Sequence, residues 1–263
     1  MSVKICLDAG HFGKYNRSPG VPEYYESDMN WKLHLLLKQE LEKYGFEVIL
    51  TRADQQTDLE LTRRGRAARG CDLFLSIHSN AVGSDMNETV DRPVGIHFVE
   101  DGCEADAKSR EIAAVLSKVV EKVMQTSQSA QIYSRLSEND RDGDGKINDD
   151  YYGVLYGAHQ EGVPGVILEH SFHTNTRAAK WLLEEENLRA LAVAEAAALA
   201  EYYGLNTLPF VDVPENAWYR EAVHWAWQEG ITQGRDETHF DPNQPITRAE
   251  ATAMLYRYHK MGK

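Results

Sequence analysis

The sequence predicts an α/β fold in which helices flank a mostly parallel, twisted sheet, followed by a small all-helical module. Three observations predict it. Short apolar runs alternate with longer segments whose apolar residues recur at helical spacing, an order typical of strand-helix-strand units. Residues able to do chemistry follow several of these runs. After about residue 205 the alternation stops, and a tryptophan-rich sequence with no obvious strand takes its place.

The strands and helices of the larger part can be placed in order. Five apolar runs predict strands at residues 3–8, 46–51, 73–78, 95–99 and 166–169. Apolar residues at helical spacing predict two amphipathic helices, one with Leu33, Leu36, Leu37 and Leu41, the other with Ile112, Val115, Leu116, Val119 and Val123. The alanine-rich stretch Glu185–Tyr203 predicts a last helix, and Gly204 is a plausible stop for it.

The change of character near residue 205 predicts a domain boundary. A chain of 263 residues suits one large domain and a small one better than two equal halves. We therefore expect a first domain over 1–205, a linker over 206–209 and a second module over 210–263. That module holds three of the five tryptophans, Trp218, Trp225 and Trp227.

The charge of the chain argues against two classes of partner. There are 28 Lys and Arg against 41 Asp and Glu, a formal net charge of -13, so neither nucleic acid nor an anionic membrane is expected. No apolar run approaches the roughly 18 residues that span a bilayer. The first ten residues lack the basic start and the apolar stretch of a secretion signal, so synthesis in the cytoplasm without a signal peptide is expected.

The cysteines predict no disulfide framework. Cys6, Cys71 and Cys103 are odd in number, widely spaced and without a CxxC pair. A zinc site built from cysteines is not expected either, and the three cysteines are expected to be buried or inert thiols.

Three candidate functional residues stand at or just past the ends of predicted strands. They are His11 in "DAGHFGK", His78 in "LSIHSNA" and Glu169 in "VILEHSF", and Glu26 lies at the start of a predicted helix. In parallel α/β sheets, functional groups collect at the carboxyl ends of the strands. Each residue has an ordinary structural explanation when taken alone, since a glutamate ahead of a helix is usually a solvated cap. Imidazole and carboxylate together are ligands that zinc prefers.

In this order, the motifs resemble those of zinc-dependent N-acetylmuramoyl-L-alanine amidases of the autolysin type. The matching stretches are "DAGHFG", "ESDMNWKL", "FEVILTR", "SIHSN" and "VILEHSFHTN". The resemblance implies a phosphorylase/hydrolase-like amidase fold and hydrolysis of the bond between N-acetylmuramic acid and L-alanine in peptidoglycan. It implies that His11, Glu26 and His78 bind zinc and that Glu169 is catalytic. An alternative role for Glu169 is to orient a ligand histidine.

The chain departs from the family pattern after Glu169. The family commonly has glycine two positions later, where this chain has Ser171. The flanking His170 and His173 either contact substrate or lie on the surface, and neither is expected to bind the metal.

An acidic insertion forms the second departure. Asp140, Asp142 and Asp144, followed by Gly145, reproduce the opening of a calcium-binding loop. The twelfth position, which should carry the closing carboxylate, is Tyr151. Bound Ca2+ as a structural brace and a merely solvated acidic loop are therefore both open.

The tail resembles one surface-layer homology (SLH) repeat. Its features include "FVDVPENAWYREAV" and "ITRAE". The resemblance implies binding of a secondary cell-wall polysaccharide, with Arg248 as an anion contact and Trp218 stacking on a sugar. For Trp225 a core position is preferred. Three repeats usually form one unit and this chain has one, so either three chains associate through it or the module is degenerate. A homo-oligomer is expected.

The leading hypothesis is a phage or prophage endolysin that acts at the bacterial cell wall. A secreted autolysin of the same chemistry is an alternative, and so is a catalytically silent protein that only binds the wall. A zinc peptidase cutting within the stem peptide is a further alternative, because it would use the same kind of site.

Overall fold

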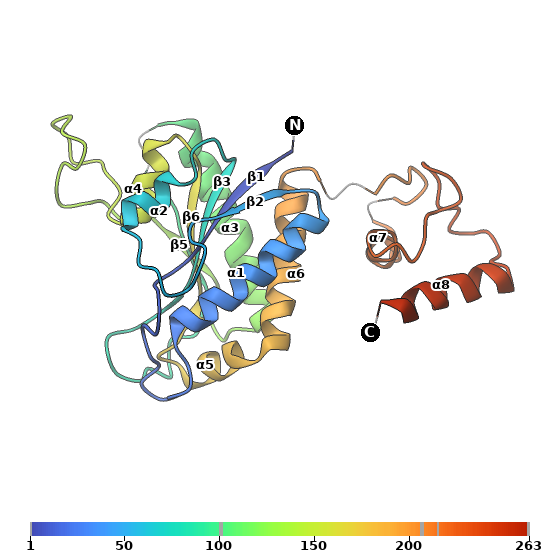
Figure 1. The fold of residues 1–263 in the computed structure, drawn as a ribbon, viewed down its shortest axis with the longest axis horizontal. Coiled ribbons are helices and arrows are strands. Elements are labelled where there is room, and N and C mark those ends of the chain that lie inside the picture. The colour runs from blue at the N-terminus through green and yellow to red at the C-terminus, as the bar shows by residue number, and fades with distance from the viewer. Residues whose placement is uncertain (1, 100–101, 206–207, 215, 262–263) are drawn as a thin grey trace. The chain divides into compact units, whose positions relative to one another are not determined.

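The chain divides into two compact units, Met1–Leu205 and Asn206–Lys263, in a computed structural model that describes residues 2–99, 102–205, 208–214 and 216–261 (Figure 1). Two residues of the expected linker, 206 and 207, lie outside the described residues. Each unit has its own buried apolar cluster and is described by itself.

The first unit contains a mixed, mostly parallel sheet of six strands. The strands follow the spatial order β2-β1-β3-β6-β4-β5, in which β4 is antiparallel to β6 and every other neighbouring pair is parallel. The strands are β1 (Lys4–Ala9), β2 (Glu47–Leu50), β3 (Leu73–Asn80), β4 (Val94–Ile96), β5 (Gln131–Tyr133) and β6 (Gly165–Phe172). The α/β prediction is confirmed. The short β5 was missed because its three residues carry no clear apolar alternation.

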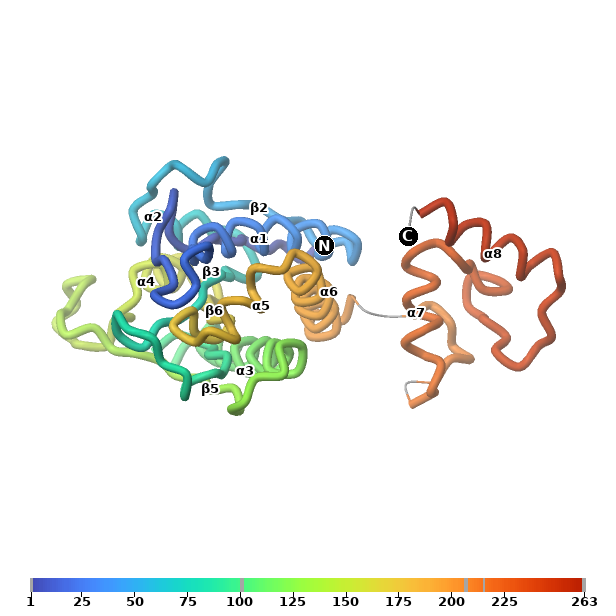
Figure 2. The backbone as a smooth tube through the Cα atoms, turned by 90° about the horizontal axis from the view of Figure 1, so that it is seen from below, coloured from blue at the N-terminus to red at the C-terminus, as the bar shows by residue number. Residues whose placement is uncertain are grey.

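Helices cover both faces of the sheet. In Figures 1 and 2, α2 and α4 lie side by side on one face, and α1 and α6 lie together on the other, which α3 also covers. The helices of this unit are α1 (Glu26–Lys43), α2 (Leu61–Arg66), α3 (Glu104–Met124), α4 (Gly153–Gln160), α5 (Thr176–Leu183) and α6 (Glu185–Tyr202). Within the described part of the chain, no helix combines the length and the apolar character needed to cross a membrane.

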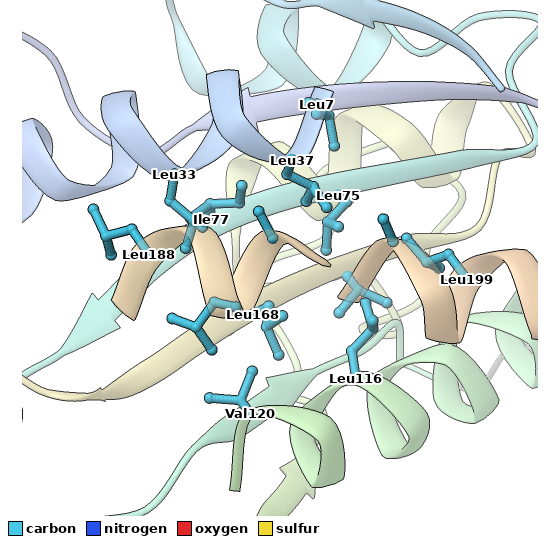
Figure 3. Packing of buried hydrophobic residues seen from close by; sticks show 14 of the residues in the cluster. Leu7, Leu33, Leu37, Leu75, Ile77, Leu116, Val120, Leu168, Leu188 and Leu199 are labelled. Carbon is cyan, nitrogen blue, oxygen red and sulfur yellow. The ribbon is translucent and has the colours of Figure 1, made fainter. Parts of the chain in front are cut away.

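Strand alternation decides which side chains fill the core and which reach the functional edge. In β3, Leu75 and Ile77 point to the face covered by α1, α3 and α6, where they meet leucines such as Leu33 and Leu37 (Figure 3). Because successive side chains in a strand point to opposite faces, His78 points to the other face. In β6, Leu168 faces the leucine core, and Glu169 therefore points to the same face as His78.

The second unit is all-helical in its described residues, with α7 (Arg220–Gln228) and α8 (Arg248–Lys260). Its core consists of Phe210, Val213 and Val223, with further apolar side chains, Trp227 among them, packed around it. The expectation that Trp225 belongs to this core is wrong, since 43% of its surface is exposed. On α7, Trp225 and Trp227 are two residues apart and therefore face different sides of the helix, and only Trp227 faces the core.

Candidate metal centre and active site

The chain turns sharply after β1 and brings His11 toward the end of β3. Gly10 makes this turn close to the imidazole of His78: a Cβ atom on Gly10 would lie 2.2 Å from Cε1 of that ring. His11 itself adopts a left-handed backbone conformation with φ 61°. Such a φ is uncommon for a residue with a side chain. The Gly-His pair of the first motif thus allows a close approach and aims the imidazole of His11.

Glu26, the first residue of α1, lies between the two histidines. Its side chain is buried, its Oε1 is 2.8 Å from Nδ1 of His78, and its Oε2 is 3.2 Å from Nε2 of His11. Oε1 also accepts a hydrogen bond from the backbone N–H of Ser79. The sequence alternative of a solvated helix cap is wrong for this residue, because the carboxylate points inward.

Asn16 completes this arrangement, and sequence reasoning missed it. Its Nδ2 donates to Oε2 of Glu26 at 2.6 Å and lies 3.1 Å from Nε2 of His11. It stands in the irregular segment before α1, where no motif marks it. A buried carboxylate held by such an amide keeps a fixed orientation.

The donor atoms of His11, Glu26 and His78 suit a divalent metal ion. One ligand atom from each lies within 4.8 Å of the others. Two imidazoles and one carboxylate are a ligand set of catalytic zinc sites, which leave a fourth position for water or substrate. The residues present therefore fit zinc by donor type and by convergence.

The electrostatics of Glu26 favour a bound positive charge. Burial alone would raise the pKa of its carboxyl group, but hydrogen bonds and charge from His11 and His78 outweigh burial and hold that pKa well below its usual range. Glu26 is thus an anion in the buried site.

Glu169 lies beside this cluster on the neighbouring strand. Its Cα pairs with that of His78 in the parallel register of β3 and β6, so the two side chains share a face. Its Oε2 is buried and has no hydrogen-bond partner in the described part of the chain. Burial, and then the negative charge of Glu26, raise the pKa of Glu169 well above its usual range. Glu169 thus holds a proton more readily than Glu26 does.

The position of Ser171 explains why the family prefers glycine there. Ser171 has φ 61°, in the left-handed region that glycine adopts at little cost. Its Oγ donates to Oδ1 of Asp91 at 2.8 Å, and Arg177 binds the same carboxylate. This buried hydrogen bond helps to hold the serine in a conformation that its backbone disfavours. Ser171 lies within the irregularity where the register of β3 and β6 shifts, because His78 pairs with Glu169 and Asn80 with Phe172.

His170 and His173 are both buried, so the suggestion that they lie on the surface is wrong. His170 pairs with the buried Glu195, with 2.8 Å between Nε2 and Oε1. His173 lies against Ser79, whose hydroxyl also accepts from the Tyr24 hydroxyl, and burial lowers the pKa of this histidine. Neither belongs to the cluster of His11, Glu26 and His78. Both histidines contact backbone oxygens near the end of β3 and so stabilise that end of the strand.

The acidic insertion brings its three aspartates together. Asp140, Asp142 and Asp144 are exposed and offer oxygens within 4.8 Å of one another. The two nearby carboxylates that could close the loop are engaged elsewhere. Asp149 accepts from the backbone N–H of Arg141, and Asp150 is buried against Val99 and His159. The three aspartates thus form only part of a calcium coordination shell, without a carboxylate to close it.

With this geometry in view, the comparison with known families identifies the first unit. The profile described as N-acetylmuramoyl-L-alanine amidase matches residues 5–201. The chain belongs to the N-acetylmuramoyl-L-alanine amidase family. An S-layer homology domain profile matches residues 209–252, which cover most of the second unit. The resemblance inferred from the motifs is therefore confirmed for both parts of the chain.

Solved amidase structures share the fold of the first unit. The catalytic domain of the amidase CwlV from Bacillus (Paenibacillus) polymyxa var. colistinus has a TM-score of 0.60 and 20% identity, over 77% of this chain and 99% of that one. AmiC2 of Nostoc punctiforme has a TM-score of 0.58 and 20% identity, over 77% of this chain and 97% of that one. At such identity the likeness establishes the amidase fold.

A curated relative matches a smaller part of the chain. The Surface-layer 125 kDa protein of Lysinibacillus sphaericus is 35% identical over 72 residues, which cover 26% of this chain. The match spans only 6% of that much longer protein.

Within the second unit, Arg248 begins α8 and is exposed, and Trp218 is 93% exposed. Both side chains are accessible to a ligand.

Proposed function

We propose that this amidase-family protein hydrolyses the amide bond between N-acetylmuramic acid and L-alanine in peptidoglycan, with zinc held by His11, Glu26 and His78. The observation that carries the proposal is the convergence of two imidazoles and a buried carboxylate beside a second carboxylate, Glu169, that has an unpaired buried oxygen. Zinc bound there would supply an activated water molecule and a Lewis acid for the amide carbonyl.

The chain's own residues divide the remaining work. His11 and His78 would offer ring nitrogens to the ion, and Glu26, fixed by Asn16, would offer an oxygen. Glu169 is proposed as the general base that takes a proton from the attacking water and as the acid that gives it to the departing amine. An amine leaves poorly without that proton. The alternative role of Glu169, orienting a ligand histidine, is less favoured, because Glu26 and Asn16 already contact the histidines.

The proposal is tested by digesting purified peptidoglycan and reading the products by mass spectrometry. Free muramoyl lactyl carboxyl groups paired with new L-alanine amino termini are expected. Glu169→Gln should lower kcat by about 10²- to 10⁴-fold with little change in KM, while Glu186→Gln, at an exposed position, serves as the matched control. New amino termini on other residues would assign a peptidase instead. Products from neither protein would favour a wall-binding role.

Zinc dependence is tested separately. Removal of the metal with a chelator should abolish the release of products, and added Zn2+ should restore it. His11→Ala should abolish activity at low zinc without unfolding the protein, since that side chain lies at the edge of the sheet. Full activity after chelation would contradict the zinc proposal.

We propose that the second unit binds secondary cell-wall polysaccharide and so holds the enzyme at the wall. Trp218 would stack on a sugar and Arg248 would pair with an anionic group. Co-sedimentation with purified walls should fall for Arg248→Ala and for Trp218→Ala, and should not change for Glu237→Ala on the same unit. Binding that survives both substitutions would contradict this assignment. An endolysin and a secreted autolysin would share the whole arrangement.

The oligomer is proposed to form through further copies of the same repeat. No described residue of α8 is buried, and the helix exposes Leu255 and Tyr256, as does Ile246 just before it. A second copy of this unit is the natural occupant, because a single repeat leaves such packing faces uncovered. Sedimentation of the protein should report more than one chain, and Leu255→Asp should yield monomers. A monomeric wild-type protein would exclude this oligomer.

A further inference from the structure

A second group of metal-ligating side chains lies away from the amidase centre. Cys103 caps the start of α3, Asp106 stands in the first turn of that helix, and His159 lies near the end of α4. Sγ of Cys103 is 3.2 Å from Oδ1 of Asp106 and 3.6 Å from Nε2 of His159, and the latter two atoms are 3.4 Å apart. Three different donor types thus converge on one point.

These separations match the edges of a tetrahedral zinc site. With Zn–S near 2.3 Å and Zn–N or Zn–O about 2.0–2.1 Å, tetrahedral geometry requires about 3.5 Å from sulfur to each other donor and about 3.4 Å from nitrogen to oxygen. The observed triangle deviates from these edges by only a few tenths of an ångström.

The surrounding groups aim the donor atoms inward. Oδ2 of Asp106 accepts from the backbone N–H groups of Gly102 and Cys103, which leaves Oδ1 directed at the sulfur and the imidazole. Nδ1 of His159 lies 2.8 Å from Oδ2 of the buried Asp150. With an ion bound, that carboxylate would accept a hydrogen bond from Nδ1–H and leave the lone pair of Nε2 for the ion.

Asp150 and the ring of His159 are themselves fixed. Oδ1 of Asp150 accepts the backbone N–H of Val99 at 2.8 Å. The imidazole stacks on Phe98 with ring centres 4.4 Å apart. A carboxylate that orients a histidine whose second nitrogen meets other donors is the outer-shell arrangement found around protein-bound zinc.

We propose that Cys103, Asp106 and His159 form a second zinc site, with Asp150 as the positioning residue for His159. Cys103 is exposed, so the fourth coordination position faces water. Because β4 is antiparallel to β6, the segment after β4 reaches the edge of the sheet opposite to Glu169. The ion would tie the start of α3 to the end of α4, and it would take no part in amide hydrolysis.

The same residues also suggest a nucleophilic cysteine with a histidine base, which is the competing explanation. A nucleophilic thiolate needs an electropositive setting. Here the thiol of Cys103 donates to Oδ1 of Asp106 at 3.2 Å, and a negative carboxylate at that distance disfavours the thiolate that a nucleophile needs unless a cation lies between them. The position of Asp106 therefore favours the metal site.

Cobalt provides a direct test in the full-length protein. After removal of metals, Co2+ is added, and the sulfur-to-cobalt charge-transfer absorption is recorded. The amidase centre has no sulfur ligand, so this band reports the second site alone. The band should appear in the wild type, persist in Cys71→Ser as the matched cysteine control, and vanish in Cys103→Ser. Absence of the band from the wild type, or its persistence in Cys103→Ser, would overturn the proposal.

Two further measurements separate the site from its competitor. Asp150→Asn, which retains an oxygen for Val99, should weaken zinc binding at this site by about 10- to 100-fold. Zinc should protect Cys103 from alkylation by iodoacetamide. If alkylation is fast, depends on His159 and is indifferent to zinc, the residues form a nucleophile and the metal site is wrong. Loss of amidase activity alone would not bear on this result, because the two sites share no residue.

Discussion

Replacement of Gly10 by alanine should displace His78 and destroy the proposed metal centre while leaving the fold intact. The added Cβ would lie 2.2 Å from Cε1 and 2.3 Å from Nε2 of His78, whereas ordinary contacts begin at 3.4 Å. The imidazole must therefore retreat by at least 1.2 Å, the difference between 3.4 and 2.2 Å. Metal–ligand distances tolerate only about 0.2 Å.

The expected losses follow from that displacement. Loss of one of three ligands should weaken zinc binding by more than about 100-fold, since a lost outer-shell contact alone costs 10- to 100-fold. Amide hydrolysis should fall accordingly. In metal-free protein, the crowding should lower the free energy of unfolding by about 1–3 kcal/mol. Gly10 has no positive φ, so the alanine backbone adds no strain of its own.

A double-mutant cycle isolates the cause. In a His78→Ala background there is no ring to displace, so the further change Gly10→Ala should cost almost nothing. Urea unfolding of the four proteins measures the coupling, and competition with a chromophoric chelator measures zinc affinity. Equal costs in both backgrounds, or a Gly10→Ala protein with normal zinc affinity, would refute the reasoning.

Three other predictions concern charge, calcium and packing. Burial raises the pKa of the Asp91 carboxyl group, but its bonds to Arg177 and Ser171 lower that pKa more, to below the ordinary value of 3.8. The stability that the Asp91 carboxylate gives the folded protein is therefore fully present above pH 3.8 and is lost as the pH falls through the folded-state pKa. Asp91→Asn should thus cost about 1–2 kcal/mol at pH 7 and progressively less as the pH falls below 3.8, by urea unfolding, and a cost that does not change with pH would contradict this. Calcium should bind the acidic loop with a Kd on the order of 10⁻⁴–10⁻³ M, because the closing carboxylates are engaged, and Asp142→Asn should weaken the binding about tenfold in calorimetry; no heat in the wild type would exclude the site. Trp227→Ala should destabilise the second unit by about 1–3 kcal/mol, and Trp225→Ala by no more than about 0.5 kcal/mol; equal thermal shifts would reverse that assignment.

Much of the amidase unit follows from local sequence patterns. The period-two alternation of β3 places His78 on the face opposite to Leu75 and Ile77 whatever the neighbouring strands are, and the same rule places Glu169 in β6. The ends of parallel strands then gather at one edge. That is why residues as distant as His11, His78 and Glu169 could be assigned together before the fold was known.

Other features depend on contacts that the local pattern does not encode. Three-residue β4 pairs antiparallel with β6, and Gly95 in it lets α3 approach closely: a Cβ on Gly95 would lie 2.6 Å from the carbonyl oxygen of Ala113. The burial of His170 depends on Glu195, twenty-five residues further along the chain. Neither partner can be read from a neighbouring stretch of sequence.

The sequence by itself therefore determined the family and the fold class, and it predicted the residues of the proposed amidase centre, since periodicity and motif order are properties of short segments. Only the tertiary structure decided that Asn16 fixes Glu26, that Ser171 takes a left-handed conformation bonded to Asp91, and that Cys103 meets His159 across fifty-six residues. These contacts form only when helices and strands pack, because packing, unlike periodicity, depends on the whole chain at once.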